Sequence, residues 1–361
     1  MSSRRPTGLG VAGDGLLRYF PECQDAFSET VYRFINDRIG SRLLRILFRQ
    51  LATEFFAWKH RGRLLIVSTH QGPLSGRGRR IIVVHDFTTL RRPYQNLAQV
   101  LGYLFLLPKA VTKSSLVVVI SGHARDELLR YLPGTRPDKV RIIPSISTRL
   151  EAFKKGGDDW QTRLKKGRFL FVGANFLHKK LDVAIEAVIE LAKRGWNVGL
   201  DVVGVSESIW EKSFGFKFAD LKEFGIVTKS YVSDAELEVL YSEATLLLFL
   251  SECEGLGFPP LEAMRKNCPV VCNDTPELRD TCGDAAFFAD ITQKGAVTAM
   301  LEQILSGKLT EEINRKVLLG NEQASKFEPA NIAPRWTSVI DECSIAGAAG
   351  KVQEKMVLNP P

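Results

Sequence analysis

Short apolar runs rich in β-branched residues alternate with amphipathic segments along most of this chain. The runs that predict strands are Leu64–Ser68, Arg80–His85, Leu116–Ser121, Val140–Pro144, Phe169–Gly173, Val198–Gly204, Leu246–Ser251, Pro269–Cys272 and Ala285–Phe288. The segments whose apolar spacing predicts helices are Lys180–Lys193, Asp234–Glu243, Pro259–Lys266 and Ala296–Leu305. Such alternation is typical of parallel sheets with helices on both faces, so we predict an α/β fold.

The alternation pauses once, at the polar stretch Ser145–Gly167, and then restarts. A length of 361 residues also exceeds what one core usually holds. We therefore predict two doubly wound, Rossmann-like domains facing each other across a cleft, at residues 1–150 and 151–330. Residues 331–361 are expected to form a helix that packs back toward the first domain, followed by a tail. Doubly wound sheets bind ligands at the carboxyl ends of their strands.

Composition places the chain among ordinary globular proteins, with 45% hydrophobic and 25% charged residues. The six cysteines show neither a Cys-x-x-Cys pair nor zinc-finger spacing, which is typical of a reducing compartment. The N-terminus lacks the apolar core of a secretory signal, and the apolar stretch Leu97–Val111 is too short to span a bilayer. We expect a cytoplasmic protein without a bound metal.

Charge is distributed unevenly. Residues 1–150 hold 24 Lys and Arg against 10 Asp and Glu, whereas residues 151–361 hold 25 against 31. Within the basic half, Thr30–Trp58 interleaves arginines with apolar residues, as in a basic amphipathic helix. Such a helix either lies on an anionic membrane or packs on the sheet with solvated arginines, and the sequence leaves both open. No helix-turn-helix, zinc-finger or RNA-binding signature is present, so nucleic acid is not an expected partner.

One predicted strand, Leu246–Leu250, leads into a turn that is suited to an anionic ligand. Gly255 and Gly257 let the backbone approach a ligand closely. Pro259 and Pro260 then open a helix, whose free N–H groups and positive dipole end are expected to face the turn.

Two glutamates flank this helix start, Glu254 before it and Glu262 within its first turns. The segment Glu254–Glu262, together with Pro269–Val271 and Pro276–Ala286, resembles the E-x7-E region of the family 4 retaining glycosyltransferases. These are group 1 glycosyl transferases with the GT-B fold. The resemblance implies that Glu254 contacts the donor sugar, that Glu262 binds the ribose hydroxyls, and that Gly255, Leu256 and Gly257 line the donor. It also implies metal-independent transfer with retention of the anomeric configuration.

A basic cluster follows the first strand of the second half. Gly173, Lys179 and Lys180 are similar to the family segment that binds the diphosphate, and Lys179 falls on the family lysine. A cation at a helix start opposes the helix dipole, which favours a ligand role over simple solvation. Ala174 and His178 stand where many relatives have arginine, so this site carries fewer positive charges than theirs.

In the first half, the strand Arg80–His85 ends in a His-Asp pair that resembles the V-H-D of the family. The resemblance implies that His85 orients the reacting sugar and the leaving oxygen, while Asp86 is expected to anchor the turn. Ser121 begins a segment that looks like the family's S-x-x-[ST]-[RK] turn; an N-cap is the favoured interpretation, with a contact to the cleft as the other.

The start of the chain departs most from the family. Gly8 and Gly10 resemble the glycine-rich loop that approaches the acceptor and the donor phosphate, although a lone G-x-G is a weak signal. Only six residues precede Thr7, so the first strand that is usual in such a domain is expected to be missing.

With these patterns, the family resemblance implies a retaining, metal-independent hexosyltransferase of polysaccharide biosynthesis. It would move mannose or glucose from a nucleotide sugar, such as GDP-mannose or UDP-glucose, to a glycan or lipid-linked acceptor, without a further cofactor. A peripheral contact with the anionic inner face of a membrane is a second expectation. The alternative is a catalytically impaired relative that binds the nucleotide sugar without transferring it, motivated by Ala174 and the missing strand.

Overall fold

The computed structural model describes residues 40, 42–67, 72–75, 78–91, 97–157, 160–173, 177–206, 217–345 and 357–359. By internal packing the chain divides into two units. Unit 1 comprises residues 1–148 and 329–361, and unit 2 comprises residues 149–328. The boundary falls inside the polar stretch at 145–167, which holds two short helices that its composition did not predict, α8 (Thr148–Ala152) and α9 (Trp160–Leu164).

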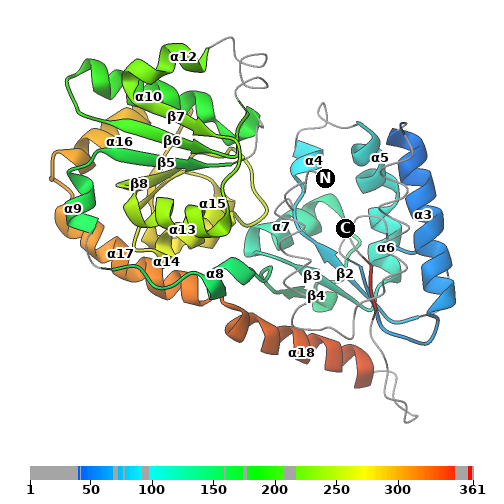
Figure 1. The fold of residues 1–361 in the computed structure, drawn as a ribbon. Helices are drawn as coiled ribbons and strands as arrows, with labels where there is room; N and C mark the ends of the chain where they lie inside the picture. The colour runs from blue at the N-terminus through cyan, green and yellow to red at the C-terminus, as the bar shows by residue number, and fades with distance from the viewer. Residues whose placement is uncertain are drawn as a thin grey trace. The chain divides into compact units, whose positions relative to one another are not determined.

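Unit 1 is built on a parallel sheet whose strand order is β11-β1-β2-β3-β4 (Figure 1). Its strands are β1 (Leu65–Val67), β2 (Arg80–Val84), β3 (Leu116–Val119), β4 (Val140–Ile142) and β11 (Val357–Asn359). Its helices are α3 (Arg42–Lys59), α4 (Thr88–Arg91), α5 (Leu97–Phe105), α6 (Leu107–Lys113), α7 (Gly122–Tyr131), the 3-10 turn η3 (Pro137–Lys139) and α18 (Pro329–Ile345).

The last long helix and the last strand both complete unit 1. Buried side chains of α18, among them Ile332 and Trp336, pack with Ile66 and Ile81 of the sheet in one core. Helices α6 and α7 contact β2 and β3. Strand β11 pairs with β1 in parallel register, opposite Leu65–Val67. The position beside β1 is therefore filled from the far end of the chain, while residues 1–39, which include Gly8 and Gly10, lie outside the described residues.

Unit 2 is built on a parallel sheet with the order β10-β9-β8-β5-β6-β7. Its strands are β5 (Arg168–Val172), β6 (Gly199–Val203), β7 (Ile226–Lys229), β8 (Leu246–Phe249), β9 (Val270–Asn273) and β10 (Phe287–Ala289). Its helices, besides α8 and α9, are η4 (Leu177–Lys179), α10 (Leu181–Lys193), α12 (Phe218–Leu221), η5 (Lys222–Phe224), α13 (Asp234–Glu243), α14 (Phe258–Arg265), α15 (Pro276–Cys282), η6 (Gly283–Ala285), α16 (Ala296–Leu305) and α17 (Thr310–Ser325).

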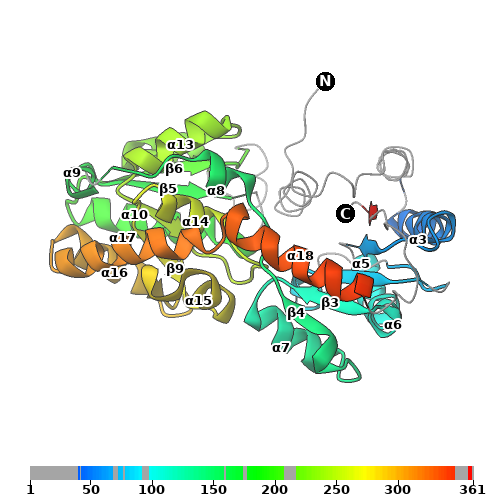
Figure 2. The same cartoon turned by 90° about the horizontal axis from the view of Figure 1, so that it is seen from below.

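Helices lie on the sheet of unit 2 in two groups. Apolar residues of α10 and α16, such as Val188 and Leu301, share one core with Phe169 and Leu248 of the sheet. Helix α14 contacts β8 and β9 and packs beside α13, α15 and α17 (Figure 2). Two parallel, helix-covered sheets confirm the predicted α/β architecture. The helices that the structure describes include none long and apolar enough to cross a bilayer.

Candidate donor-binding site

The turn between β8 and α14 requires glycine at its last position. Gly257 has φ 82° and ψ 73°, in the left-handed region. A Cβ added to it would lie 3.2 Å from the Phe249 ring and 3.3 Å from Leu278 Cδ2. Helix α14 then begins at Phe258, one residue before the predicted start. Both the conformation and the close packing therefore explain this glycine.

The helix start offers fewer backbone donors than the sequence pattern indicated. The first turn of a helix leaves its backbone N–H groups unpaired. Two of these groups are missing in α14, because Pro259 and Pro260 have no N–H. Gly257 and Phe258 retain theirs. An anion at this helix end therefore depends more on nearby side chains than on the backbone.

Two buried side chains fix the shape of the turn. Thr281 Oγ1 donates to the Leu256 carbonyl at 2.5 Å, and Asn273 Nδ2 donates to the Ser251 carbonyl at 3.1 Å. Leu256 itself is 5% exposed, so it packs inward rather than toward solvent. The turn is thus held by α15 and β9 independently of any ligand.

Lysines from one loop and glutamates from another meet beside this turn. The Lys179 ammonium forms an ion pair with Glu254, and the two side chains are 17% and 12% exposed. Lys179 Nζ also lies 5.4 Å from the centroid of the Phe249 ring. Lys180 Nζ lies 3.3 Å from Glu252 Oε1. Because β5 and β8 are neighbours in the sheet, the loops that follow them bring these four charges together.

The backbone around the lysines is unusual. Lys180 has φ 56° and ψ 45°, a left-handed conformation that costs a non-glycine residue free energy. The His178 carbonyl accepts the Glu252 N–H at 2.9 Å and joins the two loops. A Cβ at Gly173 would lie 3.2 Å from the Phe171 ring and 3.8 Å from Lys179 Cγ. A side chain at Gly173 would therefore crowd the Phe171 ring, whereas its contact with Lys179 would be an ordinary one. Ala174 lies outside the described residues.

Glu262 occupies a different environment. It is 1% exposed, its Oε2 accepts the Tyr241 hydroxyl at 2.9 Å, and its Oε1 lies 3.6 Å from Arg149 Nη1. Arg149 Nη2 also pairs with Asp234 Oδ1 at 3.0 Å. Among the described residues, the polar partners of Glu262 are thus Tyr241 and Arg149, and not the Lys179–Glu254 pair.

Burial controls the ionisation of this network. It raises the pKa of Glu262, although the charge of Arg149 and the hydrogen bond from Tyr241 act to lower it. Burial, followed by the nearby Glu262 carboxyl, also raises the pKa of Tyr241 well above 10. Burial acts to lower the pKa of Arg149, but the charges of Glu262 and Asp234 outweigh it and raise that pKa. Neither Arg149 nor Tyr241 is predicted from the sequence, because neither lies in a local motif.

Those predicted residues of unit 1 that the structure describes lie at the carboxyl ends of its strands. His85 follows β2 and is half-buried. Asp86 Oδ1 accepts the Thr88 N–H at 2.9 Å and so anchors the turn, as predicted. Ser121 Oγ accepts the Ala124 N–H at 3.1 Å and caps α7, which is the favoured of its two interpretations.

Several known proteins are similar to this chain in sequence. Residues 152–317 match the family described as glycosyl transferases group 1. The chain is 27% identical over 230 residues to the O-antigen chain mannosyltransferase RfbU of Salmonella typhimurium, covering 63% of this chain and 61% of that protein. It is 25% identical over 265 residues to the O-antigen chain mannosyltransferase B of Escherichia coli, covering 70% of this chain and 68% of that protein. The chain thus spans about three-fifths of the length of RfbU.

Solved structures agree on the fold. Sucrose-phosphate synthase from Thermosynechococcus elongatus aligns with a TM-score of 0.69 at 15% identity, covering 84% of this chain and 79% of that one. HepE of Anabaena in complex with UDP aligns with a TM-score of 0.62 at 16% identity, covering 83% and 77%. These likenesses show the GT-B fold. In sequence, residues 152–317 are similar to the group 1 glycosyl transferases, and the chain is similar to the mannosyltransferases named above.

Proposed function

We propose that the chain is a retaining hexosyltransferase that moves mannose from a nucleotide sugar to a glycan or lipid-linked acceptor. The observation that carries this proposal is the Lys179–Glu254 pair at the carboxyl ends of β5 and β8. Two relatives are named as mannosyltransferases of O-antigen chains, which supports mannose and a polysaccharide product. A structural neighbour holds UDP and glucose, which supports a nucleotide-sugar donor.

The four charges beside the turn suit the chemistry of such a transfer. As the sugar leaves, negative charge develops on the diphosphate, and the ammonium groups of Lys179 and Lys180 lie where two loops could hold it. When the lysines turn to the phosphates, Glu254 is released to accept hydrogen bonds from sugar hydroxyls. In this proposal lysines compensate the charge, so neither a metal nor a further cofactor is required.

The acceptor side and the place of the reaction follow as parts of the same proposal. His85, at the end of β2, is our candidate for orienting the reacting sugar. The reaction would take place in the cytoplasm, with the acceptor carried on a glycan or on a lipid at the membrane.

A thermal-shift panel with UDP, GDP and ADP tests donor binding. One diphosphate should raise Tm by several degrees at concentrations well above its Kd, because it binds only the folded state. Lys179→Ala should abolish most of this shift. Lys193→Ala, at the other end of α10, is the matched control and should leave the shift unchanged. Absence of a shift with all three diphosphates would overturn the proposal.

Transfer itself separates this function from a second candidate, a relative that binds the donor without transferring it. Ala174 and His178, at positions where many relatives have arginine, favour that candidate. Labelled GDP-mannose and UDP-glucose should be consumed in the presence of a suitable glycan acceptor. Tight donor binding without hydrolysis or transfer across an acceptor panel would instead support the second candidate.

A further inference from the structure

The backbone that carries His85 is short and is held at both ends. His85, Asp86 and Phe87 alone join β2 to α4. Strand β2 is paired with β3 as far as Val84, so the sheet fixes the backbone before His85. The Phe87 carbonyl accepts the Leu90 N–H at 2.9 Å, so the first turn of α4 fixes the backbone after it. Between these two supports, the direction of the His85 side chain depends on how the backbone of Asp86 is held.

A tyrosine of α5 holds the backbone of Asp86. The Tyr103 hydroxyl donates to the Asp86 carbonyl oxygen at 3.2 Å. Asp86 Oδ1 accepts the Thr88 N–H, so the side chain of the same residue is tied to α4. Burial raises the pKa of Tyr103, and the charge of the Asp86 carboxylate raises it further. The hydroxyl therefore keeps its proton at physiological pH and remains a hydrogen-bond donor.

Aromatic packing fixes the ring of Tyr103. Phe87 is buried, and its ring centroid lies 6.0 Å from that of Tyr103, with an angle of 71° between the ring planes. The Phe87 ring also lies 5.2 Å from the ring of Tyr131, at 23°. Edge-to-face and offset-stacked pairs are the favourable arrangements of aromatic rings. Tyr103 belongs to α5 and Tyr131 to α7, and α5 contacts α4 (Figure 1), so these rings join the helices around the segment that carries His85.

The two tyrosines differ in what their hydroxyl groups do. Both rings pack on Phe87, and the Tyr103 hydroxyl reaches the Asp86 carbonyl. Among the described residues, the Tyr131 hydroxyl has no hydrogen-bond partner. Removing the oxygen of Tyr131 therefore leaves both the packing on Phe87 and the hydrogen bond to Asp86 in place, which makes Tyr131 the matched reference for Tyr103.

We propose that Tyr103 is a positioning residue for sugar transfer: its hydroxyl holds the Asp86 backbone and thereby sets the direction of the His85 imidazole. His85 orients the reacting sugar in the proposed function, on which this assignment rests. A side chain that acts on a reacting group has to be held within about 0.5 Å of its productive position, so its support affects the rate more than the binding of the substrate. The charges beside the donor turn, such as Lys179 and Glu254, belong to unit 2 and are not part of this support.

Histidine NMR tests the positioning without any donor or acceptor. The chain has five histidines, and the spectrum of His85→Ala identifies the signal of His85 in the full chain with labelled histidine. Tyr103→Phe removes one oxygen and keeps the ring on Phe87, so the variant is expected to fold. It should shift or broaden the His85 signal and leave that of His178, in unit 2, in place. Tyr131→Phe should leave the His85 signal unchanged.

Transfer kinetics test the consequence for the reaction. Tyr103→Phe should lower kcat about tenfold and keep the KM of the nucleotide sugar within about twofold of the wild-type value, because donor binding is not touched. In a chain that already carries His85→Ala, the same change should cost nothing further, since no imidazole is left to direct. Tyr131→Phe should keep the wild-type kcat.

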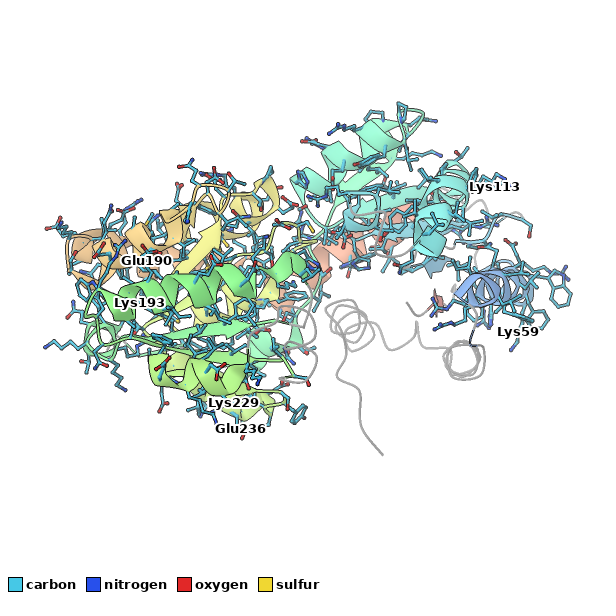
Figure 3. All side chains as sticks on the ribbon, turned by 90° about the horizontal axis from the view of Figure 1, so that it is seen from above. Lys59, Lys113, Glu190, Lys193, Lys229 and Glu236 are labelled. Carbon is cyan, nitrogen blue, oxygen red and sulfur yellow. The ribbon has the colours of Figure 1, made fainter. Side chains whose placement is uncertain are left out.

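A second control removes a hydrogen bond of the same kind elsewhere in unit 1. Lys113, the last residue of α6, donates to the Leu74 carbonyl (Figure 3). It precedes the amino end of β3, whereas His85 follows the carboxyl end of the neighbouring β2. Lys113→Met should therefore keep the wild-type kcat and the His85 signal.

Two results would overturn the proposal. One is a His85 signal that Tyr103→Phe leaves unchanged. The other is an equal loss of kcat when Tyr103→Phe is added to the wild type and to His85→Ala, which would mean that the hydroxyl acts independently of His85. A wild type that transfers no sugar would instead overturn the proposed function, and the histidine spectra would still decide whether Tyr103 directs His85.

Discussion

Glu254 and Glu262 belong to one short segment, but their surroundings differ sharply. The Glu254 side chain is 12% exposed and, among the described residues, pairs with Lys179, which is itself 17% exposed. Glu262 is 1% exposed and is held by a tyrosine hydroxyl and an arginine within a helix layer. The first glutamate stands at the end of a strand, and the second lies inside the packing of α14.

This difference distinguishes an ion pair that can exchange a partner for a ligand from a network that stabilises the fold. A partly exposed ion pair can replace one partner by a ligand at little cost, whereas a buried network loses several interactions at once. Glu254 is therefore suited to contact a donor. Glu262, through Tyr241 and Arg149, links α14 to α13 and to the start of unit 2. Glu262 as a ribose ligand stays a prediction, which requires Glu262 to exchange Tyr241 or Arg149 for the sugar.

The largest expected effect is on catalysis at the Glu254 end. Glu254→Gln should lower the transfer rate by about 10³-fold, because the variant loses a charged contact to the sugar in the transition state. Its Tm should stay close to the wild-type value, since the amide has nearly the same shape. The measurement is single-turnover transfer with labelled donor. Glu252→Gln, in the neighbouring pair with Lys180, should lose far less, and an equal loss in both variants would contradict this assignment.

The next effect is on stability at the Glu262 end. Arg149→Met should destabilise the protein by about 3–5 kcal/mol, because it leaves the Glu262 carboxyl buried without its cation. Urea unfolding followed by tryptophan fluorescence measures the change. Adding Glu262→Gln to the variant should restore much of the loss. Arg194→Met, which breaks pairs with Glu190 and Glu302 at 43% exposure, should cost less than about 1 kcal/mol.

A smaller effect is expected at the turn between the two glutamates. Gly257→Ala should cost roughly 1–3 kcal/mol, because it combines a left-handed backbone with contacts to Phe249 and Leu278. Gly195→Ala separates the two causes, since Gly195 has φ 90° but nothing within 4 Å of an added Cβ. Equal losses in thermal unfolding would mean that crowding at Gly257 contributes nothing.

The smallest effect concerns pH. Burial raises the pKa of Glu262 above its ordinary value of 4.5, so between 4.5 and the raised pKa the folded chain holds a proton that the unfolded chain has released. Wild-type stability from this group is therefore present at low pH and declines as pH rises through that interval. The free energy of unfolding of Glu262→Gln minus that of the wild type should increase from pH 4 to pH 7, by about 1.4 kcal/mol for each unit of pKa elevation, as urea unfolding at each pH measures. A difference independent of pH would refute the assignment.

Sequence periodicity was sufficient for most strands of the two sheets and for four helices of unit 2, α10, α13, α14 and α16. Asp234–Glu243 and Ala296–Leu305 are helices with the predicted bounds, and the predicted strands agree to within a few residues. Strand β7 was missed because Ile226 is its one buried residue, as expected of a short edge strand. Strand β11 pairs with a partner almost three hundred residues away, which no local pattern reports.

The candidate site was predictable only where a motif carries it. The glycines at the end of a predicted strand indicated the turn with Gly257, Glu254 and Glu262. The lysines at a helix start, where they oppose the helix dipole, indicated Lys179. The partners of Glu262 could not be predicted from the sequence. Arg149 lies in a polar stretch that resembles a linker, and Tyr241 resembles any other aromatic residue of a core. Nor could residue types show that Glu262 is turned inward, since this depends on the packing of α13 against α14.

The discontinuity of unit 1 has a consequence for the order of events during synthesis. Unit 2 is one uninterrupted segment, whereas the sheet and core of unit 1 include α18 and β11 from the end of the chain. As the ribosome proceeds from the N-terminus, unit 2 has all its residues before unit 1 has its own. Strands β1–β4 must therefore wait for α18 and β11, which are made after unit 2, and the nascent chain carries an unfinished unit 1 until those two segments have emerged.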